Sequence, residues 1–331
     1  MTTAPDATPA RPRLSVVGTA ERLAERVEQV RGAEVSLAWN PEFLREGFAV
    51  RDTLEPDRLV FGVQPGDARS EERLRAAYAP VLERGTPVVV TDFATAQLVK
   101  VAANAFLATK ISFINAMAEV CEATGGDVTM LSKALSYDAR IGGRFLNAGL
   151  GFGGGCLPKD IRAFMARAGE LGVDQALSFL KEVDAINMRR RARMVDLARE
   201  ELDGSFGGMR VAVLGAAFKP DSDDIRDSPA LDVAAAMQRQ GAAVTVYDPA
   251  AMDNARVKYP ELGYRDSAAG AAKGADLVLL LTEWQEFREM DPADLGQVVE
   301  NRRILDGRNA LDPDRWRTAG WTYRALGRPQ G

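Results

Sequence analysis

The chain has 331 residues, of which 46% are hydrophobic and 27% charged, and its formal net charge is −5. This composition is typical of a soluble globular protein with room for two domains, and it excludes a dominant basic surface for nucleic acid or a membrane. Histidine is absent, which excludes Ser-His-Asp and Cys-His catalysis and the usual zinc sites, so we expect no metal. The two cysteines lie far apart, and no signal peptide or membrane-spanning run is visible, so we expect a reducing, cytoplasmic setting.

The first part of the chain has an α/β pattern. Residues 1–12 are rich in Thr, Ala and Pro, and we predict a disordered tail. Residues 13–91 are predicted to form part of a Rossmann-like domain. Its expected elements are a helix at 19–31, a short buried strand at 35–38, a strand at 59–63, a helix at 71–82 and a strand at 87–90.

Residues 92–202 have a mostly helical pattern. The run Ala96–Thr124 is longer than a typical globular helix and suits a connector that also forms a dimer interface. Lys100 and Asn104 lie four residues apart, so they share one face of this helix, among small and apolar residues. A partly buried lysine there could stabilise an oxyanion, although a surface lysine beside a polar residue is the simpler alternative. Cys121 falls in an apolar helical pattern and is interpreted as core packing.

The stretch Gly151–Asp160 reads Gly-Phe-Gly-Gly-Gly-Cys-Leu-Pro-Lys-Asp. Glycines let the backbone come close to a ligand, and a helical pattern follows at 161–172. A thiol beside a lysine at a helix N-terminus is a better nucleophile than an ordinary thiol. The alternative is a flexible turn with an incidental buried cysteine.

A second α/β unit, residues 209–328, follows a Gly-Ser-rich linker at 203–208. Strands alternating with helices predict a parallel, doubly wound sheet. The expected strands are 210–214, 243–247, 277–281 and 303–305. The first turn, Gly215–Pro220, holds one glycine and is therefore not a dinucleotide fingerprint.

Five separated motifs resemble those of the UDP-glucose/GDP-mannose dehydrogenase family, over about residues 15–327. They are Asn-Pro-Glu-Phe-Leu-Arg-Glu-Gly (40–47) with Asp52 and Pro56-Asp57-Arg58, the Lys100/Asn104 helix, Gly151–Asp160, Gly215–Pro220 with Asp223–Pro229, and Asp-Gly-Arg-Asn (306–309). The resemblance implies an α/β protein with a partial Rossmann-like NAD-binding domain, a long helical connector and a C-terminal doubly wound UDP-binding domain.

The resemblance also assigns site residues. For catalysis these are Cys156 as nucleophile, Lys100 and Asn104 on the oxyanion, Asp160 positioning water and supporting Lys100, Glu46 as base for hydrolysis, and Glu42 ordering the water. For the UDP-sugar they are Phe43, Leu44, Phe145, Leu146, Asn147, Gly149, Gly153, Phe218, Lys219 and Arg308, with Arg140 reaching the substrate of a neighbouring subunit. For NAD they are Glu46, Lys159 and Arg226.

The activity implied is an NAD-dependent, two-step oxidation of UDP-glucose to UDP-glucuronate through a Cys156 thioester. Two oxidations at one carbon need a covalent hold on the aldehyde, which explains the cysteine. A sibling enzyme for GDP-mannose or a UDP-N-acetylhexosamine is the alternative substrate class. The strings Glu-Phe-Leu-Arg-Glu-Gly and Asp-Asp-Ile-Arg-Asp-Ser-Pro favour glucose.

The family's Gly-x-Gly-x-x-Gly turn and the acidic residue after its second strand are not found in the sequence. Leu14 also stands where the family has a threonine that helps bind water. We therefore expect a family member lacking the first half of its cofactor domain, with weak NAD binding unless another chain completes the sheet. A third interpretation follows, in which the chain binds a UDP-sugar or a partner without turnover.

Overall fold

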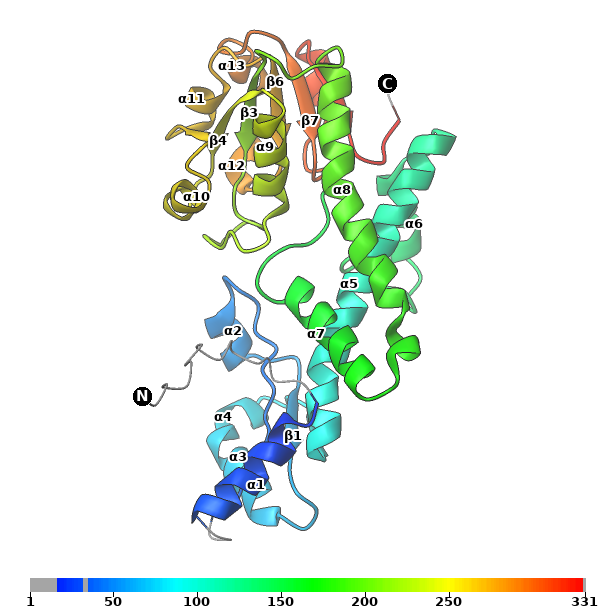
Figure 1. The fold of residues 1–331 in the computed structure, drawn as a ribbon, viewed down its shortest axis with the longest axis vertical. Helices are drawn as coiled ribbons and strands as arrows, with labels where there is room; N and C mark the ends of the chain where they lie inside the picture. The colour runs from blue at the N-terminus through cyan, green and yellow to red at the C-terminus, as the bar shows by residue number, and fades with distance from the viewer. Residues whose placement is uncertain (1–16, 32–34, 330–331) are drawn as a thin grey trace, which may run out of the picture. The chain divides into compact units, whose positions relative to one another are not determined.

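The structure is a computed structural model that describes residues 17–31 and 35–329. Its contacts divide the chain into two compact units. Unit 1 comprises the residues up to Asn104 together with Arg162–Ala176, and unit 2 comprises Ala105–Ile161 and Leu177 onwards. Figure 1 shows the elements in chain order. The predicted tail at 1–12 and the substitution at Leu14 lie outside the described residues.

Unit 1 is built around a two-stranded parallel sheet. Its elements are α1 (Thr19–Arg31), α2 (Ala49–Leu54), β1 (Leu59–Gly62), α3 (Ala68–Ala77), α4 (Ala79–Leu82), β2 (Val88–Thr91) and the start of α5 (Phe93–Thr124). β1 pairs with β2 from Leu59–Val88 to Gly62–Thr91. Leu59 and Phe61 are buried with Val81 beneath the helices. The predicted helix at 19–31 and both predicted strands near 59–63 and 87–90 are confirmed.

Two predictions in unit 1 are wrong. The segment 35–38 is not a strand. The isolated β-bridge near it, in the described part of unit 1, joins Trp39 to Gly62 and lies just after the segment. Val35, which was expected to be buried, is 49% exposed. The helix expected at 71–82 is two helices, α3 and α4, with Tyr78 between them. Pro80 explains the break, since it has no N–H to continue the α-helical hydrogen bonds and favours the first turn of a new helix.

Four longer helices follow the predicted helical pattern. They are α5 (Phe93–Thr124), α6 (Val128–Ser136), α7 (Leu157–Glu170) and α8 (Phe179–Glu201), with a short 3₁₀ helix at Asp174–Leu177. Cys121 is buried in the cluster between α5 and α6, as predicted, and burial raises the pKa of its thiol. Among the described residues, α5 is the one helix long and apolar enough to cross a membrane, with a mean hydropathy of 1.3. Core helices of soluble proteins meet the same criterion.

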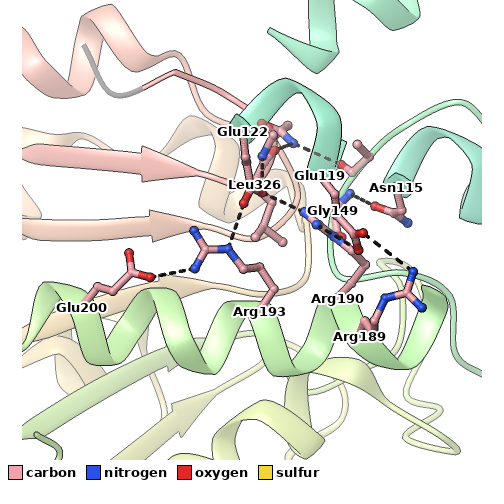
Figure 2. Close-up of polar contacts among 12 residues, drawn as sticks. Asn115, Glu119, Glu122, Gly149, Arg189, Arg190, Arg193, Glu200 and Leu326 are labelled. Carbon is pink, nitrogen blue, oxygen red and sulfur yellow. Dashed lines mark hydrogen bonds and ion pairs between the residues drawn. The ribbon is translucent and has the colours of Figure 1, made fainter. Parts of the chain in front are cut away.

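Within unit 2, α5 and α8 are joined by charged side chains (Figure 2). The Arg190 side chain is fully buried, and its Nη2 lies 3.2 Å from Glu122 Oε1. Glu122 also accepts hydrogen bonds from Arg193 Nε at 2.8 Å and from the Gly327 N–H at 3.0 Å. Burial alone would raise the pKa of Glu122, but these partners and the Arg190 charge outweigh it and hold the pKa below its ordinary value. This carboxylate therefore links both helices to the end of the C-terminal sheet.

The C-terminal part of unit 2 is a six-stranded parallel sheet in the order β5-β4-β3-β6-β7-β8. Its strands are β3 (Arg210–Leu214), β4 (Ala243–Tyr247), β5 (Gly263–Tyr264), β6 (Leu277–Leu280), β7 (Arg303–Asp306) and β8 (Thr322–Ala325). Its helices are α9 (Pro229–Arg239), α10 (Met252–Lys258), α11 (Ala268–Ala272), α12 (Gln285–Glu289), α13 (Pro292–Leu295) and α14 (Pro313–Thr318). The doubly wound prediction is confirmed, whereas the edge strands β5 and β8 were not predicted.

The two faces of this sheet bury separate clusters. Val211 and Val213 face a core that includes Met194 of α8, and Ala212 and Leu214 face the opposite core. This alternation is the period-2 pattern of a strand covered on both faces. Phe206, inside the predicted linker, is 2% exposed and packs into the same core as α8. The strand order reverses between β3 and β6, so the carboxyl ends of these strands are where a parallel sheet binds its ligand.

Candidate active site

Cys156 lies at the N-terminus of α7 and is exposed to solvent. Its carbonyl oxygen accepts the Asp160 N–H at 2.9 Å, which makes Cys156 the first residue of the helical hydrogen-bond ladder. The helix begins at Leu157, four residues earlier than predicted, because Pro158 is preorganised for a first turn. Asp160 is 6% exposed, and its Oδ1 lies 3.6 Å from Lys159 Nζ. The thiol therefore lies at the end of the helix where the first backbone N–H groups have no partner within the helix.

The loop before Cys156 lies directly against the C-terminal sheet domain. The Gly154 N–H donates to the Arg226 carbonyl at 2.8 Å. A Cβ placed on Gly153 would lie 2.2 Å from the Asp227 carbonyl oxygen, so no larger residue fits there. Thus the Gly-rich motif and the Asp-Asp-Ile-Arg-Asp-Ser-Pro motif, 70 residues apart, are in contact within one unit.

Arg308 joins three of the sequence motifs. Its side chain is 11% exposed, and its Nη1 donates to the Gly151 carbonyl at 3.0 Å. Its Nη2 donates to the Phe218 carbonyl at 3.2 Å and its Nε to the Leu281 carbonyl at 2.8 Å. Most of its donor capacity therefore holds backbone in place, and a contact with the UDP-sugar would use the remaining N–H groups.

Asp306 shapes the turn that presents Arg308. It is fully buried and accepts the N–H groups of Arg308, Ala310 and Leu311 at 2.8–2.9 Å, together with the Tyr323 hydroxyl at 3.0 Å. Burial raises the pKa of Asp306, and these hydrogen bonds oppose that rise. The Asp-Gly-Arg-Asn motif is therefore a rigid turn at the end of β7.

Phe218 and Lys219 follow β3, at the end of the sheet where its order reverses. The Lys219 Nζ lies 5.5 Å from the centre of the Phe218 ring, and the Phe218 N–H donates to the Asp224 carbonyl at 3.0 Å. Arg226 holds Asp224 with three side-chain hydrogen bonds of 2.7–2.9 Å. An aromatic face beside a cation suits a uracil ring next to phosphate.

The segment 145–149 leads into the cysteine loop from the α6 side. Phe145 has φ +64° and is 39% exposed, a strained backbone that favours a functional role. Asn147 is exposed, whereas Leu146 is 1% exposed and packs in the α5–α6 core, so only its backbone could reach a ligand. Arg140 is largely exposed, and it holds the pKa of Asp138 below the ordinary value through their hydrogen bonds.

In unit 1 the structure brings Lys100 and Glu42 into an ion pair. Glu42 also accepts the Leu44 N–H at 2.7 Å, which shapes the predicted substrate loop. Lys100 has 27% of its side chain exposed, and Asn104 lies one helical turn further along α5. The partly buried stripe predicted for these two residues is therefore confirmed.

The rest of the substrate loop is held by arginines that sequence reasoning did not assign. The Arg58 guanidinium lies 3.9 Å from the centre of the Phe43 ring. Arg45 forms a 2.6 Å ion pair with Asp52 and lowers the pKa of that carboxyl, chiefly through the side-chain hydrogen bond. Glu46, the predicted base, is partly exposed in the same loop.

Three further polar residues in unit 2 hold the cysteine loop and were also missed. They are Asn115 on α5, which accepts the Gly149 N–H at 2.9 Å, and Asn187 and Arg191 on α8, which bond Phe152. The one available signal was a polar side chain on an otherwise apolar helical face.

The described part of unit 1, residues 17–31, 35–104 and 162–176, contains no strand followed by a Gly-x-Gly-x-x-Gly turn. Such a turn supplies the backbone N–H groups that hold a dinucleotide pyrophosphate. Lys159 and Arg226, in unit 2, are cations that suit its phosphates. The described residues therefore do not fit the whole NAD molecule by themselves.

A parallel doubly wound sheet with an exposed thiol at a helix N-terminus beside its ligand-binding end is typical of a nucleotide-binding protein. Comparison with known proteins identifies the group. Residues 14–82 match the NAD binding domain, 94–189 the central domain and 212–313 the UDP binding domain of the UDP-glucose/GDP-mannose dehydrogenase family. The chain belongs to this family.

Relatives and solved structures agree with this placement. The chain is 43% identical over 299 residues to a UDP-glucose 6-dehydrogenase of Rickettsia felis, covering 90% of this chain and 66% of that protein. It is 39% identical over 314 residues to the one from Rhizobium meliloti, covering 95% and 71%. A UDP-glucose dehydrogenase structure from Pyrobaculum islandicum matches with a TM-score of 0.83 and 36% identity, over 95% of this chain and 69% of that one. The chain thus spans about two thirds of the length of these relatives.

Proposed function

We propose that this chain carries the chemistry of a UDP-glucose 6-dehydrogenase, the NAD-dependent oxidation of UDP-glucose to UDP-glucuronate. The observation that carries the proposal is the placement of Cys156. It is exposed at the N-terminus of α7, on a loop held against the Phe218, Arg226 and Arg308 motifs of the sheet domain. The names of the relatives support the same activity.

In this proposal the chain's own residues hold the reacting carbon while bound NAD supplies the oxidising power. The Cys156 thiolate adds to the aldehyde that a first oxidation leaves at C6, and the adduct stays bound while a second oxidation converts it to a thioester; each oxidation would pass one hydride to NAD⁺. Water then hydrolyses the thioester, which releases the acid and returns the thiol. Lys100 and Asn104 stabilise the oxyanion. Asp160 positions the water and supports Lys100. These roles are assigned by the resemblance of the motifs.

Two carboxylates complete the proposed hydrolysis. Glu46 removes a proton from the attacking water, and Glu42, paired with Lys100, orders the water network. In this assignment Glu46 would also contribute to holding NAD. With histidine absent from the sequence, acid–base work falls to carboxylates, lysine or positioned water, and the resemblance selects Glu46.

The UDP-sugar site is proposed along the ends of β3 and β7. Phe218 and Lys219 receive the uridine diphosphate with Arg308, and the sugar lies along 145–149 and Gly153. The resemblance of the motifs also assigns Phe43 and Leu44, in unit 1, to the sugar. A sibling substrate is the alternative, and the similarity to the NDP-N-acetyl-D-galactosaminuronic acid dehydrogenase structure from Methanosarcina mazei, at 27% identity and a TM-score of 0.79, supports keeping it. A substrate screen with UDP-glucose, GDP-mannose and UDP-N-acetylhexosamines separates them.

A homodimer through α5 is proposed as the working assembly. Phe106, Phe113 and Val120 recur every seven residues and are 66%, 48% and 51% exposed, which is a single apolar stripe. Arg140, in the same unit, is exposed and available to a second subunit. We also propose a cytoplasmic location, and a complementing chain as the source of the pyrophosphate-binding turn.

Calorimetric titration of the wild-type chain and Cys156→Ser with UDP-glucose and with NAD⁺, followed by product analysis, tests the proposal. We expect Cys156→Ser to bind UDP-glucose with nearly unchanged affinity and to form no acid. Acid formation at the wild-type rate by this variant would show that Cys156 is not the nucleophile. UDP-glucose binding without NAD⁺ binding in the wild type would support the non-catalytic, partner-dependent interpretation instead.

A further inference from the structure

Asn187 is a fully buried amide on α8 that bonds the backbone on both sides of one residue in the cysteine loop. Its Oδ1 accepts the Phe152 N–H at 2.7 Å, and its Nδ2 donates to the Phe152 carbonyl at 3.0 Å. The side-chain amide thus pairs with Phe152 as a neighbouring β-strand would. Phe152 is buried, so removal of the amide would leave its N–H without this acceptor and its carbonyl with one donor fewer.

Arg191, one helical turn after Asn187, adds a second hold on the same residue. Its Nη2 donates to the Phe152 carbonyl at 3.2 Å, so that oxygen receives two hydrogen bonds from α8. Its Nη1 donates to Asp227 Oδ1 at 2.8 Å and forms an ion pair with Asp232. The guanidinium therefore fastens the loop and the N-terminus of α9 to α8 at one point.

Gly151 shows how closely the loop is seated on this amide. A Cβ added to Gly151 would lie 2.1 Å from Asn187 Oδ1, and the residue has φ +86°. A side chain here would be strained and would displace the amide from Phe152. We call Asn187 and Arg191 the clamp, and Phe152 is the residue that they hold. Gly151, directly before Phe152, therefore tolerates no larger residue.

Phe152 lies four residues before Cys156, and only Gly153, Gly154 and Gly155 stand between them. Glycines restrict the backbone least, so the three glycines alone do not fix the position of the thiol. The direction of the backbone at Phe152, the last residue held before them, therefore decides where the thiol lies. One further bond, from the Gly154 N–H to the Arg226 carbonyl, holds the glycine run. A nucleophile works only within a small error of its productive position.

We propose that Asn187, assisted by Arg191, is a positioning residue that fixes the backbone at Phe152 and so holds the Cys156 thiol at the N-terminus of α7. The catalytic part of this inference rests on the proposed function, because the Cys156 thiol is the reacting group only if the chain has that function. Neither residue forms a hydrogen bond with the cysteine among the described contacts. Their effect passes through the loop.

The test compares the full-length wild type with Asn187→Ala and with Ser112→Ala as the matched control. Ser112 is also buried, and its hydroxyl donates to the Val183 carbonyl on α8 at 2.7 Å, away from the loop. Asn187→Ala removes two buried side-chain hydrogen bonds from α8, and Ser112→Ala removes one from α5. The control therefore shows what a general loss of stability does when the loop contacts are kept. Arg191→Lys, which keeps the charge beside Asp227, is the second variant if Asn187→Ala does not fold.

Two readouts require no turnover. Amide hydrogen exchange at Phe152 should be roughly tenfold faster in Asn187→Ala than in the control, as the loss of one buried hydrogen bond predicts. Alkylation of Cys156 by iodoacetamide should be roughly threefold slower, because the thiol no longer stays at the helix N-terminus. Cys121, which is buried, serves as the internal reference.

In the dehydrogenase assay, Asn187→Ala should lose turnover number for acid formation while keeping its affinity for UDP-glucose. Exchange and alkylation rates equal to those of Ser112→Ala would overturn the inference. If both rates change as expected but the wild type oxidises no UDP-glucose, the clamp stands and the proposed function fails.

Discussion

Replacing Glu122 by Gln removes one negative charge from the junction of α5, α8 and the end of the C-terminal sheet (Figure 2). The change keeps the shape of the side chain but leaves Arg190, whose side chain is fully buried, with Glu119 at 3.7 Å as its remaining carboxylate among the described contacts. Removing one partner of a buried ion pair costs about 3–5 kcal/mol. Because Gln still accepts hydrogen bonds and Glu119 remains, we expect about 3 kcal/mol, the lower end of that range.

Urea unfolding followed by tryptophan fluorescence measures this loss. Three of the four tryptophans, Trp284, Trp316 and Trp321, lie in the sheet domain of unit 2, so the signal reports that unit. With a slope of about 3 kcal/mol per molar urea, the midpoint should fall by about 1 M. Glu119→Gln is the control, because Glu119 has 38% of its side chain exposed and both of its ion pairs are 3.7 Å long. It should shift the midpoint by less than about 0.3 M.

The same residue gives a pH dependence of known sign. The pKa of Glu122 in the folded protein lies below its ordinary value of 4.5. A lowered pKa means that its contribution to stability is present above pH 4.5 and is lost as the pH falls through the folded-state pKa. Glu122→Gln should therefore lose part of the wild type's acid sensitivity. Equal midpoints for Glu122→Gln and Glu119→Gln at neutral pH, or equal acid sensitivity of Glu122→Gln and wild type, would refute the reasoning.

Two further predictions concern the loop and the assembly. Gly153→Ala should destabilise unit 2 by about 1–3 kcal/mol and abolish acid formation. Gly207→Ala, in the same unit, is the control, because an added Cβ there would meet only Ser205 Oγ at 3.5 Å, and it should leave the urea midpoint nearly unchanged. A loop that tolerates Gly153→Ala would contradict the close approach to Asp227. Phe113→Glu should shift sedimentation towards the monomer, because it places a charge in the apolar stripe of α5. Val257→Glu, at a position 86% exposed on α10, is the control, and a dimer that survives Phe113→Glu would place the interface elsewhere.

The sequence by itself determined the repeating elements and the motifs. Helix 19–31 and the strands that begin at Arg210 and Ala243 could be read from period and composition, because each has an apolar face that local spacing reveals. Cys156 could be singled out for the same kind of reason, since a thiol after glycines and before Pro-Lys-Asp is locally distinctive. Family resemblance extended this to residue roles.

Strand pairing and the contacts of single side chains depend on residues far along the chain, so only the tertiary structure decided them. Val35–Ala38 is as apolar as a strand, but the described structure gives only Trp39 a β-bridge there, and a strand needs a neighbour. Arg308 could be read as a cation for phosphate, yet three of its donors hold backbone carbonyls from three other segments. The local pattern marks Asn187 only as a polar residue on a helical face, because its partner Phe152 lies 35 residues earlier in the chain.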